Sequence, residues 1–580
     1  TQWRDMLLKP LSKPKDKRTR SFRLLANLSH ADVQKVKQMP FFNNLGRTRS
    51  GLCVETIRRR TNPYGEMARR SVGRVGQTAE CSEVHGISGL ERALDSLLYG
   101  VPGVAEKKAL THGIVNWAKT EAVPGYDVVT TIDINMQDIV ENELNSILSY
   151  VQADWGVAVL MDVETGDIKA ISNLEKNPLG GNYIEAMNRA VLGYEPGSVV
   201  KTLSMLIALE EGVVTDLDEV IPTGRCMYMG RPITDSHATT SLKVREVLEQ
   251  SSNIAMTRII TRHFENNPGE FYSRIKELGF LTPMHTGISG ETVPRIDSVP
   301  SNRGGRLVLS RQCFGYATEI PPLYTLALYN AIANDGAFVR PRLFKRLINK
   351  ELGIDSVLPV SYIKDRICSR ENAAILRDML KRVVWGDHGT GRSLRNEYVA
   401  LAGKTGTSYM IENGQYVTSK KRLTFCGYFP ADKPRYSCIV LTCAPKVNWL
   451  GAASTSGQIM RNIAMKMYSR GMLGDNSDYH AEEPHGDVPR LAAGIGSDRR
   501  QELRDAFGIS GQLRVLRSPS GETRMGHVPS VMGMDLRSAI ATLESAGYNV
   551  GHTGSGCVVA SVPAGGTPAK PGTRVVLTLK

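Results

Sequence analysis

The feature that most constrains the fold is a pair of strand-like regions at the two ends of a long helical stretch. Residues 155–162 and 167–171 are rich in β-branched residues and flank a Glu-Thr-Gly turn, which predicts a hairpin. Strand patterns return at residues 423–429 and 437–442, and the second run is apolar almost throughout, as in a central strand. The sequence therefore predicts an α+β domain whose first and last strands pair in one sheet.

Helical patterns fill the region between these strands. Residues 199–209 are apolar at helical spacing, follow a Pro-Gly pair and precede Gly212, where a left-handed cap would end a helix. Residues 243–264 form a longer amphipathic stretch, and residues 323–333 form another that ends at Asn-Asp-Gly. These patterns predict helical structure between the two strand regions.

The chain is too long for one hydrophobic core, because its 580 residues exceed the size of about 250–300 at which single cores stop growing. We predict a basic, extended pedestal over residues 1–130 and the α+β domain over residues 131–472. A polar stretch at residues 473–524 is expected to be a linker. Residues 525–580 regain a helical pattern followed by strand runs, which predicts a small β-α-β-β module.

Positive charge is concentrated near the start of the chain. The net charge is +14, and residues 1–80 hold 18 Lys and Arg against 6 Asp and Glu. Such a block fits an anionic membrane surface, an acidic polymer or a solvated face; no nucleic-acid module accompanies it, so nucleic acid is not an expected partner. The chain has no run of about 18 apolar residues and begins with Thr1, so we expect any membrane anchor to lie upstream.

Nine cysteines are scattered through the chain without a Cys-x-x-Cys pair. This spacing argues against zinc ribbons and thioredoxin-type chemistry. Cys426, Cys438 and Cys443 lie in apolar strand-like runs, where we expect them to be buried as small hydrophobic residues.

Three short polar motifs follow one another in the α+β region. The first is Ser198-x-x-Lys201 at the start of a predicted helix, where the lysine projects toward the serine on the same face. A neutral Lys201 could take the Ser198 proton, which requires burial or a nearby cation to lower its pKa. The helix N-terminus would also favour the alkoxide. Taken alone, the motif is more often an ordinary helix surface.

The second motif, Ser251-Ser-Asn253, places polar residues within the amphipathic stretch. Serine and asparagine compete for backbone hydrogen bonds there, which predicts a break that faces a cleft. Ser251 would relay a proton and Asn253 would hold a substrate amide. A turn whose polar groups are satisfied internally is the alternative.

The third motif is Lys404-Thr405-Gly406-Thr407, ahead of the strand at residues 423–429. It predicts a strand at the edge of the cleft, in which Gly406 allows close backbone approach and the Thr407 N–H faces an oxyanion. The Thr405 and Thr407 hydroxyls would bind a carboxylate near Lys404. A surface turn is the alternative.

The combination S-x-x-K, S-D-N and K-T-G is the signature of penicillin-interactive serine enzymes. This chain departs from it only at Ser252, where the signature has aspartate. The segment Tyr194-Glu-Pro-Gly-Ser198 resembles the nucleophile segment of class B penicillin-binding proteins, and the ending resembles one PASTA module. Further similarities to that family are Arg60-Thr-Asn-Pro-Tyr-Gly65, Gly89-Leu-Glu91, Val128-Val-Thr-Thr-Ile-Asp133, Gly315-Tyr316 and Phe425-Cys-Gly-Tyr-Phe-Pro430.

This resemblance implies a penicillin-binding transpeptidase domain, with a five-stranded antiparallel sheet between helices, on an elongated pedestal. It implies acyl transfer, in which Ser198 attacks the peptide bond between two terminal D-alanines of a peptidoglycan stem. The N–H groups of Ser198 and Thr407 would form the oxyanion hole, and an amine of a second stem would accept the acyl group. β-Lactams would acylate Ser198. No metal or organic cofactor is expected.

The resemblance also implies a place on the outer, periplasmic face of the cytoplasmic membrane, in septal wall synthesis. Expected partners are a polytopic glycan polymerase and divisome proteins, with wall glycan or division proteins as candidate ligands of the PASTA module. Two alternatives use the same motifs: a D,D-carboxypeptidase or β-lactamase, and a non-catalytic β-lactam sensor or wall-binding protein.

Overall fold

The computed structural model describes residues 12–14, 17, 23–26, 28, 30–44, 52–54, 60–77, 83–110, 113–412, 414–447, 450–474 and 526–580. Arg58, Arg59 and Cys81, and most of the predicted linker, lie outside these residues. The chain divides into two compact units, Thr1–Asp95 and Ser96–Lys580. None of the helices in the described part of the chain is both long and apolar enough to cross a bilayer.

The first unit is built from short elements. Among its described residues, the helices are α2 (His30–Gln38), α3 (Pro40–Asn44), α5 (Arg69–Val72) and α6 (Gly89–Ala93), and the strands β1 (Arg74–Gly76) and β2 (His85–Ser88) pair antiparallel. Arg60, from the basic block, is 2.6 Å from the Glu91 carboxylate. At least part of the positive charge is therefore neutralised within the protein.

Helix α7 (Asp95–Tyr99) starts at the last residue of the first unit, and the antiparallel pair β3 (Val104–Leu110) and β4 (Gly113–Thr120) follows in the second unit. Strand β5 (Asp127–Thr130) then pairs with β16 (Phe344–Asn349), which pairs with β17 (Ile354–Val357). Residues just before the α+β region are thus joined to a segment more than 200 residues later.

A six-stranded antiparallel sheet forms the centre of the α+β region, in the order β19-β20-β21-β6-β7-β8. The strands are β6 (Trp155–Asp162), β7 (Ile168–Glu175), β8 (Ile184–Glu185), β19 (Ala402–Glu412), β20 (Gln415–Phe429) and β21 (Tyr436–Cys443). The predicted pairing of first and last strands is confirmed, because β21 pairs with β6 from Tyr436↔Asp162 to Cys443↔Trp155. The sixth strand, absent from the expected five, is the two-residue β8.

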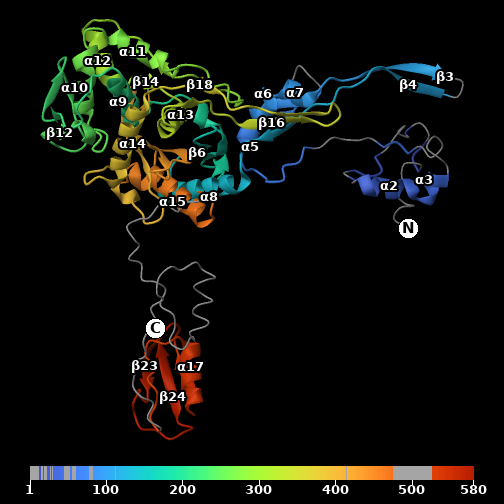
Figure 1. Ribbon diagram of the computed structural model, residues 1–580. Coiled ribbons are helices and arrows are strands. Elements are labelled where there is room, and N and C mark those ends of the chain that lie inside the picture. Colours follow the sequence, from blue (N-terminus) through green and yellow to red (C-terminus); the bar gives the residue numbers. More distant parts are fainter. Residues whose placement is uncertain are drawn as a thin grey trace. The chain divides into compact units, whose positions relative to one another are not determined.

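Helices cover both faces of this sheet (Figure 1). On one face, α8 (Ile134–Val151) and α15 (Gln458–Ser469) share a buried apolar core with side chains of β6, β20 and β21. On the other, α13 (Pro322–Ala333) is buried along its whole length and packs on β20 and β21. Cys426, Cys438 and Cys443 are buried, as predicted, and they are free thiols.

The helical region contains further helices and several two-stranded ribbons. The helical elements are η2 (Arg189–Val191), η3 (Gly197–Val200), α9 (Lys201–Glu210), η4 (Val244–Glu246), α10 (Asn253–Phe264), α11 (Pro268–Glu277), α12 (Arg303–Gln312), α14 (Arg370–Trp385), η5 (Arg392–Leu394) and the π-helical turn η6 (Ala453–Gly457). The ribbons are β9 (Val220–Pro222) with β12 (Ser241–Lys243), β10 (Cys226–Tyr228) with β11 (Arg231–Ile233), β13 (Arg295–Ile296) with β14 (Thr318–Glu319), and β15 (Phe338–Val339) with β18 (Tyr362–Lys364).

The structure corrects one helix prediction. The amphipathic stretch at residues 243–264 is divided among β12, η4 and α10, because Ser251 adopts a left-handed conformation (φ 59°) and Ser252 caps α10. The predicted break at this motif is therefore confirmed, while the single long helix is wrong.

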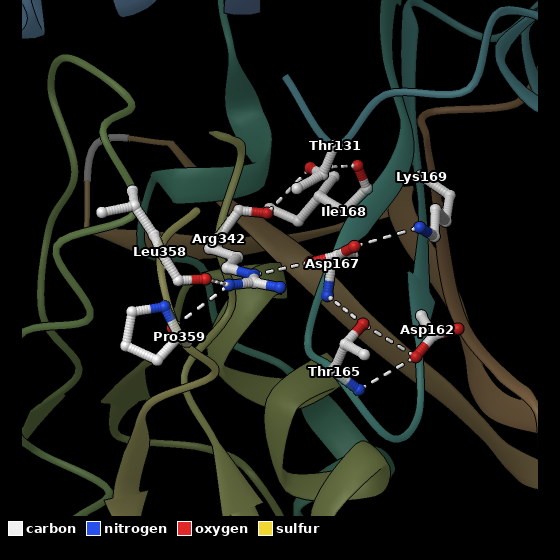
Figure 2. A network of polar contacts seen from close by, with 9 residues as sticks. All are labelled: Thr131, Asp162, Thr165, Asp167, Ile168, Lys169, Arg342, Leu358 and Pro359. Carbon is white, nitrogen blue, oxygen red and sulfur yellow. Dashed lines mark hydrogen bonds and ion pairs between the residues drawn. The ribbon is translucent and has the colours of Figure 1, made fainter. Parts of the chain in front are cut away.

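A polar network fastens the β6–β7 turn to the segment before β16 (Figure 2). The buried Asp167 carboxylate accepts from Arg342 Nε (2.6 Å) and Lys169 Nζ (3.1 Å). Arg342 also donates to two backbone carbonyls, and the Thr131 hydroxyl bonds the carbonyls of Ile168 and Arg342. Because both partners of the buried pair are otherwise hydrogen-bonded, the charges can be accommodated away from water.

The C-terminal module contains α17 (Leu536–Ser545), β22 (Asn549–Thr553), β23 (Val558–Val562) and β24 (Arg574–Leu579). Strand β24 is central, parallel to β22 and antiparallel to β23. In the described residues before the helix, where the expected β-α-β-β order has its first strand, His527 and Asp535 form isolated bridges with Pro568 and Cys557, and the additional strand β22 follows the helix.

Candidate active site

Ser198 lies in η3, immediately before α9. The preceding Gly197 has φ 61°, and a Cβ there would stand 2.4 Å from the Thr407 carbonyl oxygen. The Gly197 N–H donates to the Gly315 carbonyl (3.2 Å) on its other side. Only glycine fits this position without displacement, so the turn that presents Ser198 is held directly against β19.

Lys201 is fully buried with its amine beside Ser198. Its Nζ is 2.9 Å from Ser198 Oγ, 3.2 Å from Ser251 Oγ and 2.6 Å from the Ser251 carbonyl oxygen. Burial lowers the pKa of Lys201 to about 7, against the opposing effects of Asp235 and Cys313. A large share of Lys201 is therefore neutral near pH 7 and able to accept the serine proton.

The Ser251–Asn253 turn is held by an aspartate from the β11–β12 connection. Asp235 accepts from the Ser252 hydroxyl and from the Asn253 N–H, both at 2.5 Å. The left-handed backbone of Ser251 directs its carbonyl and hydroxyl to Lys201, while the Asn253 amide donates to the Thr234 carbonyl (2.8 Å).

Lys404 begins the polar stretch of β19, so the third motif lies on a strand as predicted, and β19 is an edge strand of the sheet. Its side chain is fully buried; burial, and secondarily the like charge of Lys201, hold the pKa of Lys404 well below 10.5. A Cβ at Gly406 would stand 3.0 Å from Val199 Cγ1, so β19 packs against the serine turn at this residue too. Ser198, Lys201, Ser251 and the Lys404–Thr407 strand thus lie around one position.

Several polar residues around the site escaped the sequence analysis. Asp235 has no motif and lies in an irregular segment, and Thr390 bonds the Thr405 hydroxyl (2.8 Å) from the loop after α14. Glu195 is buried, and one of its oxygens accepts from the Tyr416 hydroxyl at 2.9 Å. Glu195 adjoins the serine motif in sequence and could have been suspected; the others are brought in only by the tertiary fold.

Three family models match the chain. A "Penicillin binding protein transpeptidase domain" covers residues 156–465, a "Penicillin-binding Protein dimerisation domain" covers residues 2–130, and a "PASTA domain" covers residues 526–580. The transpeptidase match includes every candidate residue named above.

Individual proteins give the same result. The "Probable peptidoglycan D,D-transpeptidase PenA" of Neisseria gonorrhoeae is 28% identical over 388 residues, which are 65% of this chain and 64% of that protein. The chain thus spans somewhat less than two thirds of this relative. The "Peptidoglycan D,D-transpeptidase FtsI" of Escherichia coli K12 is 27% identical over 430 residues, 72% of this chain and 69% of that protein.

Among solved structures, penicillin-binding protein 3 of the tuberculosis Mycobacterium superposes with a TM-score of 0.60 at 26% identity, over 71% of this chain and 90% of that one. Its structures include complexes with aztreonam and ampicillin. Because the transpeptidase model alone covers more than half of the residues, the chain belongs to the penicillin-binding protein transpeptidase family.

Proposed function

We propose that the protein is a serine D,D-transpeptidase that cross-links peptidoglycan stem peptides through an acyl-enzyme on Ser198. The observation that carries this proposal is the contact between a serine hydroxyl and a fully buried amine at 2.9 Å, with the pKa of that amine lowered to about 7. An amine of ordinary pKa would be protonated near neutrality and could not take the serine proton.

In the proposed reaction Ser198 Oγ attacks the carbonyl between the two terminal D-alanines while Lys201 takes its proton. The N–H groups of Ser198 and Thr407 stabilise the tetrahedral oxyanion. The C–N bond then breaks, and the proton passes through Ser251 to the departing D-alanine. An amine of a second stem attacks the ester, releases Ser198 and forms the cross-link; its surplus proton returns to the Lys201–Ser198 pair.

The strand of the third motif would bind the donor. The Thr405 and Thr407 hydroxyls donate hydrogen bonds to the terminal carboxylate, with Lys404 behind them and Asn253 on the peptide amide. Gly406 keeps the strand close to the serine turn. β-Lactams imitate the donor and acylate Ser198. We place the reaction in the cell envelope during septal wall synthesis, with a glycan polymerase and divisome proteins as partners.

The test is the mass of the intact protein after incubation with penicillin. Wild type should gain one penicilloyl group and Ser198→Ala none. Ser204→Ala provides a control on the same helix: it removes a buried hydroxyl that bonds the Cys313 carbonyl, and labelling should persist. A labelled Ser198→Ala protein would refute the assignment of the nucleophile.

Transpeptidation and hydrolysis differ in whether an amine or water receives the acyl group, and the products distinguish them. With a D-alanyl thioester donor and a D-amino acid acceptor, a transpeptidase yields the amide in proportion to acceptor. Release of free acid alone, with rapid loss of the penicilloyl adduct, would favour the carboxypeptidase or β-lactamase alternative. No turnover of the thioester would favour the non-catalytic one.

A further inference from the structure

Three metal-ligating side chains meet at the ends of the helices that carry the first two motifs. Glu211 follows the last residue of α9, His263 is next to last in α10, and Glu270 lies in the first turn of α11. One ligand atom of each lies within 4.8 Å of the others. Among the residues that the structure describes, this is the cluster with such geometry.

Within the ion pairs that Arg274 forms, negative charge exceeds positive charge. Arg274 is 3.0 Å from Glu211, 3.6 Å from Glu270 and 2.9 Å from Glu277. Three carboxylates thus share one guanidinium, which leaves two negative charges uncompensated among these four side chains. His263 adds a ring nitrogen as a third ligand atom beside the two carboxylates. A cavity of about 360 Å³, lined by Glu211 and Arg274 among others, adjoins the cluster.

We propose that Glu211, His263 and Glu270 bind one divalent transition-metal ion, with zinc the best match. One imidazole nitrogen and two carboxylate oxygens form a known zinc ligand set, with bond lengths of about 2.0–2.2 Å and a fourth position open to water. Ligand atoms within 4.8 Å of one another need only a small closure to reach one ion. Calcium and magnesium are disfavoured because they take oxygen ligands.

A bound metal ion would displace the Arg274 guanidinium from two of its three carboxylate partners, and Arg274 would keep the third. Arg274 holds Glu211 and Glu270 through one nitrogen and Glu277 through the other. When the metal takes the first two carboxylates, the guanidinium retains Glu277 and turns toward the adjoining cavity. Arg274 therefore competes with the metal, and its removal should tighten binding.

The site would act on the helices and not on the reacting atoms. Helix α9 begins three residues after Ser198, and α10 begins two residues after Ser251. An ion that joins the far ends of both helices restricts their relative movement, and with it the spacing between Lys201 and the Ser251 turn. We therefore assign the metal a structural role, outside the acyl-transfer steps.

The experiment is calorimetric titration of the chelator-treated full-length protein with Zn²⁺, supported by the visible spectrum of the Co²⁺ form and by thermal melting. One equivalent should bind and raise the melting temperature. His263→Gln and Glu270→Gln should each lose about 100-fold or more in affinity, because loss of a direct ligand costs at least as much as loss of an outer partner. Arg274→Gln should gain about tenfold by removing a competing charge.

His552→Gln, an exposed imidazole in the C-terminal module, is the matched control and should bind like wild type. Circular dichroism of each variant establishes folding independently of any activity. The proposal fails if wild type takes up no Zn²⁺ or Co²⁺ at millimolar concentration. It also fails if folded His263→Gln and Glu270→Gln bind like wild type, since the ion would then lie elsewhere, and unchanged affinity in Arg274→Gln would contradict the displacement.

Discussion

The pH dependence of acylation tests the central claim about Lys201. With a pKa of about 7, Lys201 is about one tenth neutral at pH 6, one half at pH 7 and nine tenths at pH 8. If the neutral amine is the base, the second-order rate constant for acylation should rise about tenfold from pH 6 to pH 8 and then level off. A lysine of pKa 10.5 would instead give a rise of about 100-fold over the same interval, with no plateau.

The assay is stopped-flow acylation by a fluorescent penicillin, whose carboxylate stays ionised throughout. Asp235→Asn provides an internal check: Asp235 raises the pKa of Lys201, so its neutralisation should move the midpoint to lower pH. Asp235 also holds the Ser252 hydroxyl, so the plateau rate should fall as well. A flat profile, or a slope of one that continues beyond pH 9, would refute the assignment of Lys201 as a buried, neutral base.

Three further predictions concern folding and packing. The lowered pKa of Lys201 costs the folded state about 5 kcal/mol of stability below pH 7, relative to a lysine with the ordinary pKa of 10.5. Between pH 7 and 10.5 the folded protein binds fewer protons than the unfolded protein. The free energy of unfolding of the wild type therefore rises with pH in that window. Lys201→Met removes this cost but also loses hydrogen bonds worth about 1 kcal/mol each, so it should be more stable than wild type by about 2 kcal/mol at pH 6. Urea unfolding measures the difference, which should disappear by pH 10. Gly197→Ala should abolish penicillin labelling, whereas Gly212→Ala, with φ 62° and nothing within 4 Å, should retain it; equal labelling would contradict a tight fit of the serine turn on β19. Arg342→Met should lower stability by about 3 kcal/mol by leaving a buried aspartate with one cation, with little change in the acylation rate of the folded protein, and an unchanged melting temperature would count against the network.

The sheet could be predicted because its strands carry local signals. The β-branched residues of β6 and β7 and the apolar residues of β21 predict strands from local sequence alone. The pairing of β21 with β6 follows from their positions at the two ends of the domain. The division of residues 243–264 could not be predicted in detail. Amphipathic spacing persists across Ser251, and the left-handed turn there is stabilised by Asp235, whose proximity depends on the fold.

The site residues that belong to one of the three motifs could be predicted from the sequence. Lys201 lies within hydrogen-bonding distance of Ser198 and Ser251 as expected, and it is fully buried, which is the condition that a neutral lysine requires. Residues that support the motifs carried no such signal. Thr390 lies in a loop far along the chain, and Asp235 in an irregular segment, where an acidic residue is ordinarily a solvated one.

The pairing of β6 with β21 in the centre of the sheet means that the sheet cannot be completed until late in the synthesis of the domain. Strand β6 emerges early, yet its partner β21 is among the last parts of the domain to be made. Until then the nascent chain holds β6 with one unpaired edge, and premature termination before Tyr436 leaves that edge and the edge of β20 open to other chains. Products truncated before Tyr436 should therefore aggregate more than products that end after residue 474, as measured by the fraction that sediments on centrifugation.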